Sequence, residues 1–177
     1  MPIATAAAPR IPAEEPVAQV FSEHAQFVFR TAFGVTGSHE DAEDVLQTVF
    51  LRLVRQELSP EFGTNSRAYL YRSAVNAALD VMRSRRRRRL VAVAELPETA
   101  GPAAEAVDEA DHRALYEAIA ELKPESAQIL ILRYVHDMSD AAIARMLGVS
   151  RGTIALRLFR SRARLRKLLG ARIREKS

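Results

Sequence analysis

The chain has 177 residues, which is enough for one large domain or two small ones. It contains no cysteine and no tryptophan, and aromatic residues make up only 6% of it. The absence of cysteine excludes disulfide bonds, thiolate zinc sites and a cysteine nucleophile. The scarcity of aromatic residues and glycine favours helices over a β-sandwich. The net charge of +4 is modest, but its uneven distribution along the chain indicates an anionic partner.

The first sixteen residues carry four of the eight prolines, so we expect residues 1–16 to be a disordered tail. They lack the basic start of a signal peptide. Nowhere does the sequence contain an apolar run long enough to span a bilayer. These observations predict a cytoplasmic protein without a membrane-inserted segment.

The hydrophobic pattern predicts a first helical domain over residues 17–90. One helix is expected from Val17 to about Val35. Ser38 opens a capping box for a second helix, whose apolar residues recur at helical spacing. The residues expected to face the core from these helices are Val17, Val20, Phe21, Phe27, Val28, Val35, Ala42, Val45, Leu46, Val49, Phe50, Leu53 and Val54.

A loop is expected over residues 58–66, because Pro60 and Gly63 break helicity. The next helix starts near Ser66 and runs into residues 83–89, the arginine run, which holds six arginines in seven positions. A cationic helix C-terminus is favourable for the helix dipole, but six arginines repel one another unless an anion is near. We interpret the run as a nucleic-acid contact, with a solvated helix end as the alternative. The core residues expected here are Leu70, Ala74, Ala77 and Val81.

Residues 91–111 have the composition of a linker. They contain six acidic residues, two prolines and neither lysine nor arginine. Such a segment is expected to be flexible and extended. Its carboxylates, among them Glu105, Asp108, Glu109 and Asp111, are expected to lie near the basic regions of the free protein and to compete with DNA.

A second helical domain is predicted over residues 112–177. One of its helices is marked by apolar residues, and Pro124 opens the next helix in its first turn. The residues expected to pack in these two helices are Leu115, Ile119, Leu122, Ala127, Leu130, Ile131 and Tyr134.

The segment from Asp140 to Gly170 has the pattern of a helix-turn-helix. Ala144 and Gly148 are spaced for a tight turn, and Ser150 is placed to cap the second helix. From Arg151 to Lys176 there are ten basic residues and one acidic residue. This excess predicts a recognition helix in the DNA major groove, the alternative being a helical hairpin with a solvated basic face. The expected contacts between the helices are Ile143, Leu147, Val149, Ile154 and Leu158.

The sequence offers no catalytic constellation. It contains no phosphate-binding glycine loop and no Ser/His/Asp set, and its four histidines lack metal-ligand spacing. We therefore expect an all-α protein of two small domains joined by a flexible acidic linker, without enzymatic activity, metal or cofactor.

Two blocks resemble one known family. Bacterial sigma factors of the extracytoplasmic-function type, within the sigma-70 family, have a region 2 that resembles residues 37–55 (GSHEDAEDVLQTVFLRLVR) and 67–88 (RAYLYRSAVNAALDVMRSRRRR). Their region 4 resembles residues 121–166 (ELKPESAQILILRYVHDMSDAAIARMLGVSRGTIALRLFRSRARLR). The resemblance covers nearly everything from Val17 to Leu169, and both blocks in this order make it specific.

The resemblance implies a dissociable subunit of RNA polymerase that directs the core enzyme to the −10 and −35 elements of promoters. In the family, the second helix docks on the clamp helices of the largest polymerase subunit. From the residues alone, that acidic face is an ordinary solvated side with acids near a helix N-terminus. The residues that the resemblance assigns to polymerase binding are Glu43, Asp44, Gln47 and Arg52.

The helix before the arginine run is implied to contact the −10 element, and the loop before it to receive a flipped base. Phe62 and Asn76 fall where the family builds that pocket, since an aromatic ring stacks on a base and an amide reads its edge. The residues alone leave Phe62 equally open to a role as a loop anchor on the core. The residues assigned to −10 binding are Phe62, Tyr69, Arg72, Asn76, Asp80, Arg83 and Arg87.

The recognition helix is implied to read the −35 element. Ala155 and Leu156 replace a lysine and a serine that are commoner in the family, which removes two polar groups near the DNA. The residues assigned to −35 binding are Arg151, Thr153, Arg157, Arg160 and Arg164.

The resemblance implies three partners: core RNA polymerase, promoter DNA and a separate anti-sigma protein. The alternative is a stand-alone helix-turn-helix regulator that binds an operator as a dimer. Such a regulator needs a dimerising surface or a ligand pocket, and the N-terminal part of the sequence shows neither pattern.

Overall fold

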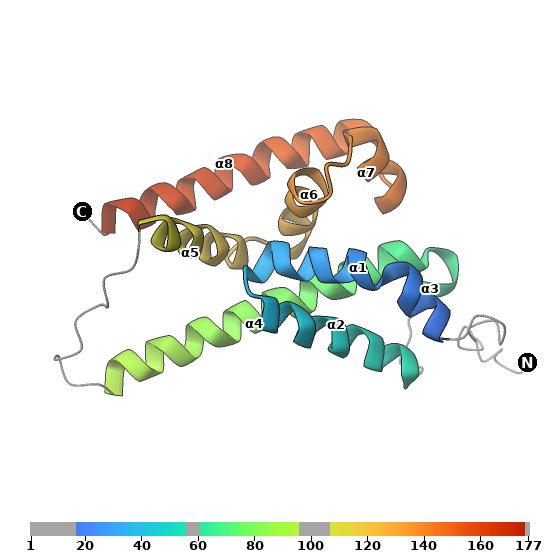
Figure 1. Ribbon diagram of the computed structural model, residues 1–177. Helices are drawn as coiled ribbons and strands as arrows, with labels where there is room; N and C mark the ends of the chain where they lie inside the picture. The colour runs from blue at the N-terminus through green and yellow to red at the C-terminus, as the bar shows by residue number, and fades with distance from the viewer. Residues whose placement is uncertain (1–16, 56–60, 96–106, 176–177) are drawn as a thin grey trace, which may run out of the picture.

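The computed structural model describes residues 17–55, 61–95 and 107–175. Over these residues the fold is all-α, as the sequence predicts. Figure 1 shows the N-terminal half, α1 to α4, lying against the C-terminal half, α5 to α8. The helices are α1 (Val17–Thr36), α2 (His39–Val54), α3 (Glu61–Thr64), α4 (Ser66–Glu95), α5 (Val107–Ala120), α6 (Pro124–Tyr134), α7 (Asp140–Leu147) and α8 (Arg151–Glu175).

The N-terminal half is a bundle of α1, α2 and α4 around a core of aliphatic side chains. Gly37 makes the turn between α1 and α2 with a φ of +66°, a conformation that favours glycine. The predicted cap at Ser38 is confirmed, because its Oγ accepts the N–H of Asp41 at 3.3 Å. The largest side chains fully buried in this half include Val28, Val35, Val45, Leu53, Leu70, Tyr71 and Leu79.

The two halves share one continuous core. Tyr71 of α4 is fully buried, and its hydroxyl donates a hydrogen bond to the backbone carbonyl of Gln128 in α6. Arg30 of α1 donates to the carbonyl of Val135 at 2.9 Å. Asn65, just before α4, donates to the carbonyl of Met146 in α7 at 3.2 Å. The described parts of the chain therefore form a closed arrangement, in which the halves bury side chains against each other.

A glycine permits the close approach of α1 to the end of α6. A Cβ atom built on Gly34 would lie 2.7 Å from Cγ2 of Val135, closer than real contacts allow. The closed arrangement therefore depends on the missing side chain at position 34.

Both ends of the predicted linker differ from the expectation of an extended chain. Helix α4 continues past the arginine run to Glu95, and α5 already begins at Val107. Alanine and valine residues lie on both sides of the linker prolines and are compatible with a helix. Composition alone therefore did not locate the end of α4 or the start of α5. Residues 96–106 lie outside the described part of the chain. The loop expected over 58–66 likewise contains a short helix, α3.

Three side chains expected in the core are exposed instead. Phe21, Val54 and Tyr134 are 44%, 62% and 58% exposed. Val54 ends α2 and Tyr134 ends α6, so each lies beyond the last turn that the neighbouring helices cover. Phe21 packs edge-on against Phe50, with ring centroids 4.7 Å apart, but keeps its outer face in solvent.

Phe62 does not occupy the exposed setting expected of a base-stacking residue. It is only 7% exposed, and its ring meets that of Tyr69 edge-on with a centroid distance of 5.6 Å. Helix α3 turns this side chain onto the start of α4, where it joins the core. The structure thus favours the other interpretation of Phe62, that of an anchor folded back on the domain.

Replacing Phe62 with alanine should destabilise the fold by about 3–5 kcal/mol, because it removes a buried aromatic ring and leaves a cavity. Phe62→Leu should cost clearly less. Phe159→Ala is the matched control, since Phe159 is 66% exposed; it should change the free energy of unfolding by less than about 0.5 kcal/mol. Urea denaturation of the three variants measures the free energy of unfolding. If all three variants lost equally little of it, Phe62 would not be part of the core.

His136 joins the halves through a neutral imidazole. Its Nε2 lies 2.8 Å from Oγ1 of Thr31, whose own hydroxyl donates to the carbonyl of Phe27. The hydroxyl proton is thus used, so the protonated Nε2 of His136 donates to Thr31. Burial, together with the charges of Arg30 and Arg67, lowers the pKa of His136 from 6.5 to about 4, against a smaller opposing effect of Asp137.

Acidification should weaken the fold through His136. The folded-state pKa lies below the unfolded value, so the stabilisation is fully present above about pH 6.5. It is lost progressively as the pH falls from there through about 4. His136→Gln keeps an N–H donor but does not titrate, so its melting temperature should fall less over this interval. Parallel melting curves for both proteins measure the difference, and identical pH profiles would contradict the role of His136.

Candidate nucleic-acid and polymerase interfaces

The helix-turn-helix is formed as the sequence predicts. Gly148 ends α7 in a left-handed conformation with a φ of +68°. Ser150 caps α8, because its Oγ accepts the N–H of Thr153 at 3.1 Å. Ile143 and Ile154 are fully buried where the two helices meet. Helix α8 is therefore held rigidly on α7 through its first two turns.

The outward face of α8 is basic. Arg151, Arg157, Arg160 and Arg164 are exposed, while Thr153 is partly buried and shares a hydrogen bond with Ser150. Positions 153, 157, 160 and 164 recur at helical spacing and so lie on one face. The structure thus brings four of the five predicted −35 residues onto one face, while Arg151 is the first residue of α8 and lies off that face.

The same helix carries exposed apolar side chains, one of which, Phe159, sequence reasoning did not single out. Leu156 is 49% exposed and Phe159 is 66% exposed. Phe159 lines a shallow groove of about 470 Å³ together with Leu130, Tyr134, Arg162, Leu165 and Arg166. The sequence signal was present, because Phe159 follows Leu158 directly and so falls outside the helical spacing that joins Ile154 and Leu158.

The predicted −10 residues form a stripe along α4 that is only partly accessible. Asn76, Asp80 and Arg87 are exposed, whereas Tyr69, Arg72 and Arg83 are partly buried. Asp80 lies 3.7 Å from Arg83, one turn along the same helix. Phe62 is separated from this solvent-facing stripe by its burial in the core.

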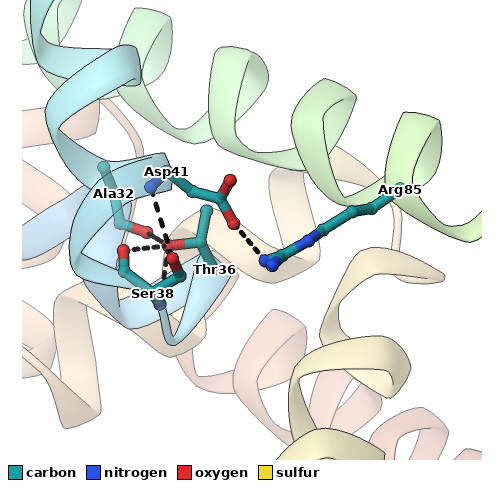
Figure 2. A network of polar contacts seen from close by, with 5 residues as sticks. All are labelled: Ala32, Thr36, Ser38, Asp41 and Arg85. Atoms are coloured by element: carbon teal, nitrogen blue, oxygen red, sulfur yellow. Dashed lines mark hydrogen bonds and ion pairs between the residues drawn. The ribbon is translucent and has the colours of Figure 1, made fainter.

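One end of the arginine run is tied to the corner between α1 and α2, as Figure 2 shows. Arg85 reaches from α4 to the carboxylate of Asp41, forming an ion pair and hydrogen bond. The hydroxyl of Thr36 stabilises the same corner. It donates to the carbonyl of Ala32 at 3.0 Å and accepts the backbone N–H of Ser38 at 3.3 Å. Asp41 is thus part of a fixed corner rather than a freely moving acid.

Other arginines of the run contact the C-terminal half. Arg83 donates to the carbonyls of Ala120 and Leu122, at 3.3 and 3.4 Å. Arg86 pairs with Glu121, and Arg89 pairs with Glu117 at 3.0 Å. The sequence predicted that an anion lies beside the arginine run. In the closed arrangement, carbonyls and carboxylates of the C-terminal half lie beside it. Sequence reasoning missed Glu117 of α5 and Glu121, which directly follows α5, because nothing local connects them to α4.

Helix α2 presents a polar face to solvent. Glu43, Asp44, Gln47 and Arg52 are all exposed. The opposite side of α2 is occupied by core residues, so these four have no packing role. Leu51 and Val54, which are 50% and 62% exposed, add apolar surface to the end of this helix. Such a mixed polar and apolar face can bind another protein.

Within the described ranges, no cluster of three or more histidines, cysteines or acids could hold a metal ion. None of the described helices is long and apolar enough to cross a membrane.

Family comparisons agree with this division into halves. The family model for sigma-70 region 2 matches residues 20–88, and the model for sigma-70 region 4 matches residues 112–165. The first match contains α4 up to the arginine run, and the second contains the helix-turn-helix.

Three curated relatives show the same similarity over most of their length. RNA polymerase sigma factor CarQ of Myxococcus xanthus is 33% identical over 161 residues, covering 89% of this chain and 91% of the relative. ECF RNA polymerase sigma factor SigL of Mycobacterium tuberculosis is 33% identical and covers 78% and 80%. RNA polymerase sigma-E factor of Streptomyces coelicolor is 32% identical and covers 82% and 81%.

Solved structures share the fold. The sigma factor RpoE of Bartonella quintana, solved in complex with the anti-sigma factor NepR, aligns with a TM-score of 0.51 and 26% identity, covering 86% of this chain and 96% of that one. CnrH, solved with the cytosolic domain of CnrY, aligns with a TM-score of 0.51 at 21% identity and covers 88% of each chain.

These matches exclude the alternative of a stand-alone regulator, because both halves correspond to sigma regions in the order that sigma factors have. The chain belongs to the sigma-70 family and is an RNA polymerase sigma factor of the extracytoplasmic-function type, which directs promoter recognition and transcription initiation.

Proposed function

We propose that three separate surfaces carry out promoter-directed initiation in this chain. The outer face of α2 binds core RNA polymerase, the solvent side of α4 contacts the −10 element, and the outer face of α8 reads the −35 element. The observation that carries the proposal is the arrangement of α2 and α8. Each buries one apolar stripe, and the residues assigned to polymerase or −35 binding lie on the opposite, solvent-facing side, where Glu43, Asp44, Gln47, Arg52, Arg157, Arg160 and Arg164 are exposed.

The polymerase contact rests on Glu43, Asp44, Gln47 and Arg52 of α2. Leu51 and Val54, exposed near its end, supply apolar area at the rim. A polar face with a small apolar component is typical of an interface between proteins that also exist apart.

The −10 contact rests on Asn76, Asp80 and Arg87, which are exposed along α4, with Tyr69, Arg72 and Arg83 beside them. Phe62 is left out of this set because it belongs to the core. The −35 contact rests on Arg151, Thr153, Arg157, Arg160 and Arg164 of α8.

A separate anti-sigma protein is proposed as a further partner. RpoE of Bartonella quintana, which this chain matches over 96% of its length, was solved with an anti-sigma factor. The exposed aromatic side chains of Tyr134 and Phe159, flanked by Arg162 and Arg166, are suited to an amphipathic segment with acidic residues.

Asp44→Arg combined with Gln47→Ala should weaken binding to core RNA polymerase by about 30-fold or more, the effect of losing an interface hot spot. Helicity and melting temperature should stay unchanged, because both side chains are exposed. Glu23→Arg with Gln26→Ala is the matched control, since it makes the same change in charge at exposed positions of α1. Biolayer interferometry with core enzyme measures the affinity, and unaltered binding would remove α2 from the interface.

Arg157→Ala should relax the preference for one base of the −35 element, because a bidentate arginine–guanine contact provides about 1–3 kcal/mol of discrimination. Arg166→Ala, further along α8, should instead weaken binding to all sequences equally and lower its salt dependence, as loss of a phosphate contact does. Transcription by the reconstituted holoenzyme on a library of −35 variants separates the two effects. Identical profiles for the two variants would refute this division of roles.

A further inference from the structure

A pocket of about 570 Å³ lies where the turn between α1 and α2 meets α4 and α5. Its walls come from both halves of the chain: Phe33 and Gly37 belong to the N-terminal half, and His112 and Tyr116 to the C-terminal half. Pockets of this volume are typical of sites for small molecules. None of the described residues that line it was assigned to polymerase, −10 or −35 binding, so the pocket is a separate feature of the molecule.

The lining of this pocket is strongly basic. Among the described lining residues, four are arginines and one, Glu117, is acidic. Arg85, Arg86 and Arg89 come from α4, and Arg113 comes from α5. A concave surface with such an excess of guanidinium groups attracts anions, and the planar fork of arginine matches a phosphate group with two parallel hydrogen bonds.

The three arginines of α4 are fixed in position and can still bind a second anion. Each forms an ion pair through one terminal nitrogen, Nη1. Figure 2 shows Arg85 held in this way by Asp41, beside Thr36 and Ser38, which also line the pocket. A guanidinium group has five N–H donors, so donors remain for a ligand. The three side chains are 48%, 49% and 56% exposed, which leaves them within reach of one.

Aromatic rings lie beside these charges. The ring of Tyr116 rests on the backbone of the α1–α2 turn, because a Cβ atom built on Gly37 would overlap it. Phe33 lines the same pocket and is 39% exposed, so part of its ring is open to solvent. Aromatic rings and guanidinium planes are the surfaces on which proteins stack nucleic-acid bases.

We propose that this pocket binds a nucleotide that carries two or more phosphate groups. Arg85, Arg89 and Arg113 bind the phosphates, and the base packs against the rings of Phe33 and Tyr116. An inorganic anion would satisfy the arginines but leave the exposed ring surface in water. The lining therefore suits a ligand with a flat aromatic part as well as negative charge.

The position of the pocket gives the nucleotide an effect on the whole fold. Because the walls belong to both halves, the complete site exists only while the halves are together. A ligand that binds one arrangement and not another stabilises that arrangement according to its concentration. The nucleotide therefore opposes separation of α5 from α4 and from the α1–α2 turn.

Isothermal titration calorimetry of the full chain with ADP tests the arginines, at about 0.15 M salt, where exposed charges are screened beyond roughly 8 Å. Arg85→Gln with Arg89→Gln should weaken binding about 10- to 100-fold, as expected for lost hydrogen bonds between charged groups. Arg87→Gln with Arg88→Gln makes the same change in net charge at exposed positions outside the pocket lining. Equal losses in both variants, or no binding of ADP by the wild type, would overturn the proposal.

Comparison of ADP with pyrophosphate tests the aromatic rings. The wild type should bind ADP about 5- to 100-fold more tightly, the ratio that stacking of one base provides. Phe33→Leu should reduce this ratio and leave the affinity for pyrophosphate unchanged, because only the ring is lost. Phe21→Leu is the matched control, the same change at an exposed position of α1 outside the pocket lining. Equal affinities of the wild type for ADP and pyrophosphate would show that the rings take no part and would overturn the nucleotide assignment.

Hydrogen exchange measured by mass spectrometry locates the site in the wild-type chain. With saturating ADP, backbone amides of α5 and of the α1–α2 turn should exchange at least about threefold more slowly, because the ligand opposes local opening of both walls. Helix α8, whose outer face is also basic, is the internal control and should be unaffected. Protection confined to α8, or none at α5, would place ADP on exposed arginines elsewhere and refute the pocket as its site.

Discussion

The burial of Tyr71 between α4 and α6 is the contact on which the rest of the arrangement depends. Its ring has no exposed surface, and its hydroxyl finds a partner in a backbone carbonyl of the other half. Burial raises the pKa of this hydroxyl well above its usual value, so the hydroxyl keeps its proton and acts as a donor at neutral pH. Because a buried hydroxyl without a partner is costly, the two halves cannot separate without rehydrating Tyr71.

Separating the halves would therefore be a cooperative event. The same movement exposes the ring of Tyr71, breaks the contact of Thr31 with His136 and releases the arginines from α5. The surfaces of α2 and the outer face of α8 lie away from these contacts and stay accessible in the closed arrangement. Binding of a partner to one of these accessible surfaces can then supply the free energy that separates the two halves and exposes the surface buried between them.

Local signals in the sequence predicted local structure well. Serines at 38 and 150 cap their helices, Pro124 opens α6, and the spacing of apolar residues placed α2 and the helix-turn-helix correctly. Predictions from the sequence were less complete where contacts between residues far apart in the chain determine the structure. Nothing near Phe62 in the sequence shows that α3 turns it inward. Nothing near the arginine run reveals its pairing with Glu117 of α5 and with Glu121, which directly follows α5. The resemblance to sigma factors supplied the family, but not the arrangement of its two regions in this chain.

The close approach at Gly34 has a consequence for what this position of the chain can hold. The absence of a side chain at Gly34 lets α1 approach Val135, whose carbonyl also accepts a hydrogen bond from Arg30 of α1. Any larger residue at this position, opposite a branched aliphatic partner, fills the space that the closed arrangement needs. Close packing at Gly34 therefore sets a limit on residue size at this position of the chain, which no hydrogen bond or ion pair between the halves would reveal.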